Sequence, residues 1–254
     1  MSLIGKLARA AAAVGLFVSA AVGAAGIELP AGAGLQVNGG RIDAAGGDFA
    51  IGGNLVLGSG ELRGIGALRI AAGGSADFGS GLATLSGDWE NRGSFLAGSS
   101  RVELRDGGAA SSRLLGTSEF ASLSLVTLTG KRYRFESGFT QRVAASLQIQ
   151  GSGLPLQVDV TTPGSIAFLN LLAGGTQAIA NVGVSDVYAS GQHLAPTQTN
   201  QGGNGNATGW FGGGPPPRPQ VPIPALGWPA LLMLGLAILF IASRARGRHA
   251  TVRG

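Results

Sequence analysis

Two acidic side chains, Asp88 and Glu90, are the strongest candidates for chemistry in this chain of 254 residues. They flank Trp89, so a strand at this point would place both carboxylates on one face, about 7 Å apart along it. Paired carboxyl groups carry out glycoside hydrolysis, one as acid and the other as base or nucleophile. Solvated surface carboxylates give the same pattern, and we favour that interpretation.

A basic segment, Lys131 to Arg134, is followed by Phe135. Alternation places Lys131, Tyr133 and Phe135 on one face of a strand and Arg132 with Arg134 on the other. An anionic exopolysaccharide is one expected partner of such a surface. The alternative, which we favour, is a solvated strand edge whose charges deter pairing with another strand.

The chain has few residues of the types that nucleophilic catalysis or metal binding would need. The chain has no cysteine and two histidines, of which only His193 lies between the two ends. A Ser-His-Asp triad would need His193 as its base, and no Gly-x-Ser-x-Gly segment precedes a helical one. We therefore expect no catalytic residue, no metal and no cofactor, and we interpret His193 as a solvated loop residue.

The segments that must position these groups have the alternation of short strands. Apolar pairs bracket one polar residue at Leu68 and Ile70, Val102 and Leu104, Leu123 and Leu125, Leu147 and Ile149, and Val158 and Val160. A period of two predicts strands with one buried face, and no helical period of comparable length competes with it. The chain is therefore predicted to be all-β.

Apolar anchors recur at intervals that suit a coil. They are 19 to 27 residues apart, at Leu35, Leu55, Leu82, Val102, Leu123, Leu147 and Ile166. A coil of a β-solenoid has about this length and buries its apolar face only by stacking on the next coil. Glycine, at 46 of 254 residues, supplies the corners. The sequence predicts a single Gly-rich β-solenoid domain over 26–211, with a β-sandwich as the alternative.

A module in the middle of the chain supports this architecture. Gly-Asp-Trp-Glu-Asn-Arg-Gly-Ser-Phe, residues 87–95, continues through Gly98 and Ser100 to Val102. It resembles the Gly-Asp-Trp-x-Asn-x-Gly-x-Phe-x-x-Gly-x-Ser-x-Val module of repetitive bacterial surface proteins. Segments 120–123 and 181–211 resemble later parts of the same domains. The resemblance implies a β-helical stalk at the cell surface and names no ligand.

The positive charge of the chain belongs to its ends. Two of its 18 basic residues lie in 1–25 and four follow residue 243, which leaves 12 against all 13 acidic residues, a balance of about −1. The charge therefore argues against nucleic acid as a partner.

The N-terminal segment 1–25 has the pattern of a secretory signal peptide. Lys6 and Arg9 precede an apolar stretch too short to span a bilayer, and small residues follow around Ala24 and Ala25. Signal peptidase is the expected partner, and an uncleaved anchor helix is the alternative. The chain is therefore predicted to be exported.

The C-terminal segment 223–254 begins after a Gly/Pro-rich linker, 212–222. An uncharged stretch over 225–243 has the length of a transmembrane helix and makes the membrane a partner. Arg244, Arg246 and Arg248 follow it and predict a cytoplasmic tail that stops transfer. The precursor is expected to sit in the inner membrane with its N-terminus outside.

This end resembles the IPTL-CTERM and PEP-CTERM sorting signals of Gram-negative bacteria, with Ile223, Pro224, Ala225 and Leu226 as the sorting motif. Ala225 stands where the family name has Thr. The resemblance implies an exosortase-like membrane peptidase as a partner and passage to the cell surface. A rhombosortase-type signal, using Gly212 to Gly214, and a plain single-pass anchor are the alternatives.

Together these features predict a non-enzymatic protein of the cell surface or extracellular matrix with a structural or adhesive role. A polysaccharide-active enzyme on the same β-helical scaffold is the competing class. Acidic residues clustered in one lateral groove would favour the enzyme, and a mostly neutral surface would favour the structural protein.

Overall fold

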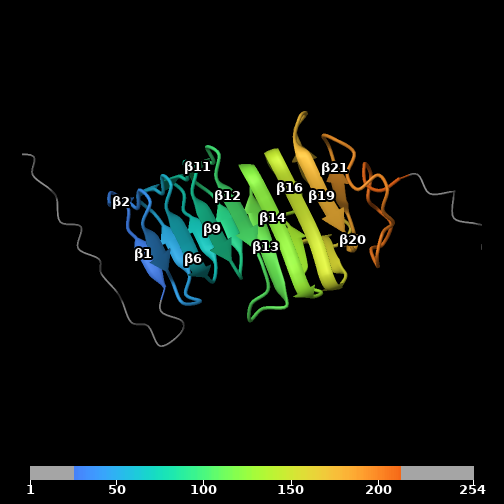
Figure 1. Ribbon diagram of the computed structural model, residues 1–254, viewed down its shortest axis with the longest axis horizontal. Helices are drawn as coiled ribbons and strands as arrows, with labels where there is room; N and C mark the ends of the chain where they lie inside the picture. The colour runs from blue at the N-terminus through green and yellow to red at the C-terminus, as the bar shows by residue number, and fades with distance from the viewer. Residues whose placement is uncertain (1–25, 213–254) are drawn as a thin grey trace, which may run out of the picture. The chain divides into compact units, whose positions relative to one another are not determined.

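The computed structural model describes residues 26–212, and within that range its regular structure consists of strands (Figure 1). Every strand pairing is parallel, and the chain passes from one sheet to the next in turn. The fold is thus a β-solenoid of about eight coils, with eight strands in its first sheet. The sandwich alternative is wrong, because a sandwich of this kind is built from antiparallel sheets.

Three sheets form the sides of the solenoid. Sheet A has the order β1 (Ile27–Leu29), β4 (Phe49–Ile51), β7 (Leu68–Ile70), β10 (Trp89–Asn91), β13 (Ser111–Gly116), β15 (Arg132–Phe135), β17 (Leu156–Val160) and β20 (Val182–Val184). Sheet B has the order β2 (Gly34–Gln36), β5 (Asn54–Val56), β8 (Ser75–Asp77) and β11 (Ser94–Leu96). Sheet C has the order β3 (Arg41–Asp43), β6 (Glu61–Ile65), β9 (Leu82–Leu85), β12 (Arg101–Leu104), β14 (Ser118–Thr129), β16 (Thr140–Leu154), β18 (Ala167–Leu171) and β21 (Val187–Ala189), and β19 (Thr176–Ala180) also pairs with β16.

The cross-section of the solenoid changes after the fourth coil. The first four coils each contribute a strand to all three sheets, whereas sheet B stops at β11. In the fifth coil the chain turns at Gly116, where φ is +77°, and β14 begins two residues later. A Cβ at Gly116 would lie 1.9 Å from the Asn91 carbonyl oxygen, so glycine is required at this corner.

The predicted alternation is confirmed in all five apolar pairs, whose members are 0–1% exposed. The predicted coil register is only partly right. Val102, Leu123 and Leu147 are stacked Cα partners, and so are Leu35 and Leu55. One inward column of sheet C consists of Leu62, Ala83, Val102, Leu123 and Leu147.

Two of the anchors lie outside their expected columns. Leu82 pairs with Arg101, because the interval from Leu55 to Leu82 crosses from sheet B to sheet C. The sheet C partner of Leu147 is Gln177 rather than Ile166. Interval lengths alone do not distinguish sheets, since a run of similar composition occurs on every side of a coil.

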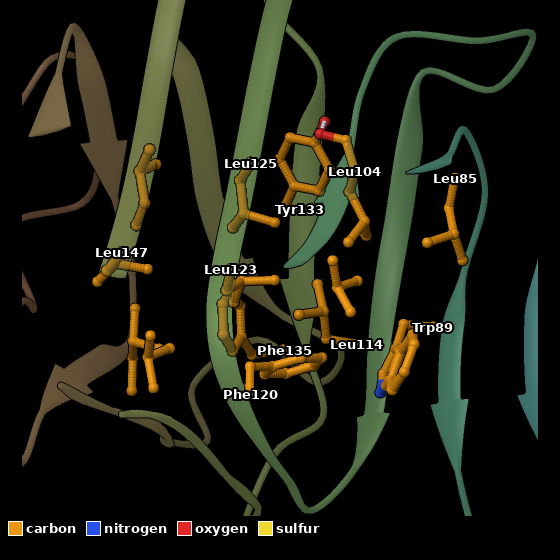
Figure 2. Close-up of a cluster of buried hydrophobic side chains, with 14 of the residues drawn as sticks. Leu85, Trp89, Leu104, Leu114, Phe120, Leu123, Leu125, Tyr133, Phe135 and Leu147 are labelled. Atoms are coloured by element: carbon orange, nitrogen blue, oxygen red, sulfur yellow. Dashed lines mark hydrogen bonds between the residues drawn. The ribbon is translucent and has the colours of Figure 1, made fainter. Parts of the chain in front are cut away.

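The core runs along the interior, and Figure 2 shows the cluster of large side chains near the point where the cross-section changes. Trp89 is 0% exposed, with ring centroids 4.9 Å from Phe95, 5.1 Å from Phe120 and 6.0 Å from Phe78. Its indole N–H donates to the Ser118 hydroxyl at 2.9 Å. The aromatic cluster therefore joins the last strands of the three-sided coils to the first long strand of the two-sided ones.

The C-terminal end of the solenoid is covered by the loop 190–211. Leu194 is 0% exposed and pairs with Trp210, while the Phe211 N–H donates to the Leu194 carbonyl at 2.7 Å. Asp186 accepts hydrogen bonds from Asn204 and Asn206 in the same loop. Hydrogen bonds from this loop thus engage polar groups at the end of the last coil, and its apolar side chains cover the end of the core.

The predicted signal peptide, transmembrane helix and sorting segment lie outside the described residues. Within 26–212, no helix has the length and apolar character needed to cross a membrane.

Trp89→Ala should destabilise residues 26–212 by about 3–5 kcal/mol, because it opens a cavity in the core and removes the partner of Ser118. Leu96→Ala, in the same coil but with a side chain 60% exposed, should change the stability by less than about 0.5 kcal/mol. Urea unfolding followed by circular dichroism measures both. Equal stabilities would contradict the inward position of Trp89.

Candidate functional site

Glu90 lies on the outer face of sheet A, Asp88 directly precedes β10, and both are engaged by arginine. The Asp88 carboxylate accepts from the Arg113 backbone N–H at 2.7 Å and from its guanidinium at 2.6 Å. Glu90 lies 2.7 Å from the Arg69 guanidinium and 3.2 Å from that of Arg92. Both carboxylates are at the surface, as expected. Their arginine partners form a network that joins neighbouring coils.

The basic segment is not a strand edge, and that interpretation is wrong. Lys131 directly precedes β15, and β15 pairs with β13 on one side and β17 on the other. Lys131 is only 2% exposed, Tyr133 is 0% exposed, and the ammonium lies 5.7 Å from the Tyr133 ring centroid. The alternation itself is confirmed, because Arg132 and Arg134 face outward, with Arg132 3.3 Å from the Asp159 carboxylate.

The buried ammonium of Lys131 is held by backbone carbonyls. Its Nζ donates to the carbonyl of Ser86 and, at 3.1 Å, to that of Arg105. Both acceptors come from the ends of earlier strands, β9 and β12, so the side chain crosses the corner between sheets C and A. A charged group in this position ties three coils together, since carbonyl oxygens replace the water that it loses.

Tyr133 and Asp106 complete the same corner. The Tyr133 hydroxyl lies 2.8 Å from the Val126 carbonyl and 3.0 Å from that of Leu104 (Figure 2). The Asp106 carboxylate accepts from the Thr127 hydroxyl at 2.6 Å and from the Leu128 N–H at 2.7 Å. We name Asp106, Lys131 and Tyr133 the corner cluster.

The titration of the corner cluster follows from its burial. Burial lowers the pKa of Lys131 below its usual range, and the nearby carboxylates of Asp106 and Asp88 oppose that shift. Burial raises the pKa of Tyr133 far above its usual value. Burial also acts to raise the pKa of Asp106, but hydrogen bonds from Thr127 and from the Leu128 backbone outweigh it and hold the pKa below its usual value.

Three adjoining surface hollows follow the corner between sheets C and A, and we call them together the corner groove. Their volumes are about 310, 420 and 450 Å³. The first two share Glu103, Arg105 and Asp106, and the second and third share Gly46 and Ser86. The groove combines charged side chains, such as Arg105 and Glu103, with apolar ones, such as Val126 and Leu128, which suits an extended ligand that has both polar and apolar faces.

The other sequence-predicted residues lie away from the corner groove. His193 is exposed in the C-terminal loop, as expected, and its Nε2 contacts the Phe211 carbonyl oxygen. Within the described chain, no three His, Asp or Glu side chains form a group that would hold a metal ion. The sorting motif, Ile223 to Leu226, and Arg244, Arg246 and Arg248 fall outside the described residues.

Sequence reasoning missed the role of Asp106 and the burial of Lys131. Asp106 lies in a glycine-rich loop between β12 and β13, and its partners are 21 to 23 residues away in β14. The sequence signal was present in the position of Lys131, which shares a face with Tyr133 and Phe135. If the face that Lys131 shares with Tyr133 and Phe135 had been given more weight than its charge, the sequence would have predicted an inward-pointing lysine.

The chain is a parallel β-solenoid with a groove along one corner that is lined by both charged and apolar side chains. The chain matches no protein-family model, no curated protein and no solved structure.

Tyr133→Phe should lower the stability by about 1–3 kcal/mol at pH 7, because two buried carbonyls lose a donor. It should also flatten the alkaline loss of stability. Folded Tyr133 keeps its proton above the usual pKa of 10.0, so its contribution is present below that pH and falls as the pH rises through it. Urea unfolding from about pH 7 to about pH 11 measures both effects.

The matched control is Tyr188→Phe. Tyr188 is the other tyrosine of the chain, and its hydroxyl donates to Asn206 at the surface. This variant should keep the alkaline loss of the parent protein. A Tyr133→Phe profile parallel to that of the parent would contradict the assigned burial.

Proposed function

We propose that this chain is an exported protein of the cell surface or extracellular matrix, with a structural or adhesive role. The observation that carries the proposal is the continuous parallel ladder of about eight coils, closed at its C-terminal end by loop 190–211. Stacked coils form a rod whose sides are much longer than those of a single coil. Such long sides suit a spacer or a binding surface.

The outer face of sheet A supports the structural role. Glu90 bridges Arg69 and Arg92, and Arg92 also reaches Glu136 at 2.9 Å. The Arg69–Glu90 and Arg92–Glu136 pairs connect different coils, and Glu90–Arg92 links the two pairs within one coil. As a network they contribute more than isolated surface pairs do. The charged side chains on this face therefore help to hold the coils together. Their charges also keep the exposed surface of the sheet soluble.

The proposed route to the surface uses both ends of the chain. Signal peptidase would remove 1–25, and an exosortase-like peptidase would recognise Ile223, Pro224, Ala225 and Leu226 ahead of the membrane span. The linker 212–222, rich in Gly and Pro, would hold the solenoid away from the bilayer. These partners, and the inner-membrane precursor, rest on the sequence patterns.

Exopolysaccharide is the ligand class that we propose for the corner groove. The groove carries Arg63, Arg105 and Arg113 beside Glu103 and Asp106 along one corner of the rod. An extended polymer fits this groove because its lining comes from several successive coils, from Gly46 and Arg63 to Leu128 and Ser152. No nucleic acid and no cofactor enter this proposal.

The corner groove gathers four acidic side chains, those of Asp48, Asp88, Glu103 and Asp106, a pattern that by itself would favour an enzyme. Arginine engages Glu103 and Asp88, and hydrogen-bond donors of the protein engage Asp48 and Asp106, so a polysaccharide-cleaving activity gains little support from the geometry. Arginine partners occupy the oxygens of Asp88 and Glu90, which a glycosidase would keep for its substrate. Binding without cleavage is therefore the function that we propose.

The route is tested by a reporter fused after Gly254 in a Gram-negative host. We expect cytoplasmic reporter activity and the solenoid accessible from outside the inner membrane, because the arginine tail stays inside. Neutralising Arg244, Arg246 and Arg248 together should reduce retention in the inner membrane, since only Arg253 then remains. A periplasmic reporter in the parent chain would refute the proposed topology.

A further inference from the structure

The two ends of the solenoid are built differently. At the C-terminal end, loop 190–211 covers the last strands, and Leu194 is 0% exposed. At the N-terminal end, the inward residues Ile27, Leu35 and Ile42 are only partly buried. Their stacked partners in the second coil, Phe49, Leu55 and Leu62, are all 0% exposed. The first coil therefore has an uncovered apolar interior among the described residues.

The first coil also has backbone groups that no described residue engages. The Ala44 N–H donates to the Arg63 carbonyl and the Glu61 N–H donates to the Gly40 carbonyl, both at 2.9 Å. Because backbone groups alternate in direction along a strand, those of Ile42 point to the second coil and those of Arg41 and Asp43 point to the open end. The open end is thus a strand edge ready to pair.

We propose that this open end pairs with the open end of a second copy of the chain, head to head. A two-fold axis through the middle of β3 places Ile42 opposite Ile42 of the partner subunit in an antiparallel pair. In that register Arg41 lies opposite Asp43 of the partner subunit, and Asp43 lies opposite Arg41 of the partner subunit. Each strand is therefore complementary to itself in charge, in apolar character and in hydrogen-bonding direction.

The rest of the first coil fits the same axis. In a three-sided coil β1 and β2 lie on either side of β3, so the axis brings β1 of one copy over β2 of the other. Leu29 and Leu35 both point inward, so apolar faces apolar across this contact. The free backbone groups of Glu28 and Gln36 point to the open end by the same alternation.

Head-to-tail stacking is disfavoured by the same observations. The C-terminal end is covered by its own loop, and its coils have two sides where the first coil has three. An uncapped three-sided end matches another three-sided end. The pairing therefore closes as a dimer rather than growing into a filament.

Cysteine cross-linking tests the dimer in the full-length chain, which has no cysteine of its own. Residues opposite each other in a non-hydrogen-bonded antiparallel pair have Cα atoms about 4.5 Å apart, within the range of about 4.4–6.8 Å that a disulfide spans. Ile42→Cys should therefore give a disulfide-linked dimer on mild oxidation, seen by non-reducing gel electrophoresis. Leu62→Cys, in the same column one coil inward, and Thr197→Cys, exposed in the C-terminal loop, should stay monomeric.

A charge exchange separates this register from chance collisions. Adding Asp43→Arg to Ile42→Cys places arginine opposite arginine and should abolish the dimer. Adding Arg41→Asp as well restores opposite charges and should restore the dimer, with circular dichroism confirming that each variant keeps its strands. The proposal is overturned if Ile42→Cys stays monomeric, as it would with residues 1–25 or another protein on this end, or if Asp43→Arg leaves the cross-link unchanged.

Discussion

Each coil of this solenoid depends on its neighbours, because a single coil of three short strands has no second layer against which to bury apolar side chains. The parallel ladders align one inward residue over the next, as in the sheet C column that passes through Leu62, Val102 and Leu147. The stacked column is what makes a strand of three residues stable. A coil without a neighbour on one side therefore loses part of its core.

The change from three sides to two is the most demanding point of the stack. Sheet B ends at β11, and the long strand β14 must cover the space that a fifth strand would have filled. Phe120 of β14 reaches back to the rings of Trp89 and Phe95, at 5.1 and 5.7 Å. Aromatic side chains are suited to this position because one ring fills the volume of several smaller groups.

Lys131 solves a related problem on the other side of the same coils. The corner between sheets C and A has carbonyl oxygens at the ends of β9 and β12, and the lysine donates to both chain segments. Its ammonium costs free energy to bury, and the surrounding carbonyls offset that cost. The corner groove and this buried cation lie beside each other, so the rigidity of the groove wall depends on Lys131 and Asp106.

Local pattern was enough to predict the strands and the solenoid. Alternation at Leu68 and Ile70 or Val158 and Val160 is fixed by which side of one strand faces the core, and neighbouring residues encode that directly. The sheet to which a run belongs is a different matter. Leu82 is apolar, as an inward anchor would be. Its position opposite Arg101 depends on the number of residues in the preceding corner.

The site residues show the same division. The outward direction of Asp88 and Glu90 follows from alternation, whereas their arginine partners, Arg113 and Arg69, come from neighbouring coils and become visible only once the coils are stacked. Burial of Lys131 likewise depends on carbonyls 26 and 45 residues away. Sequence patterns therefore predict well which way a side chain points. They predict its interaction partners poorly, because the length of each coil decides which residues stack on one another.

The ends of the rod decide how the molecule is used, because the sides repeat and the ends do not. At the C-terminal end Asp186 binds Asn204 and Asn206, and hydrogen bonds from Asn206 hold the pKa of the carboxyl below its usual value. That contribution to stability is present above the usual pKa and falls as the pH drops below it, so the cap is secure at neutral pH. At the other end the free backbone groups of Arg41 and Asp43 have no such loop among the described residues. In the proposed dimer the two open ends meet at the centre, so the two capped ends point away from each other and the paired rods cannot add further copies end to end.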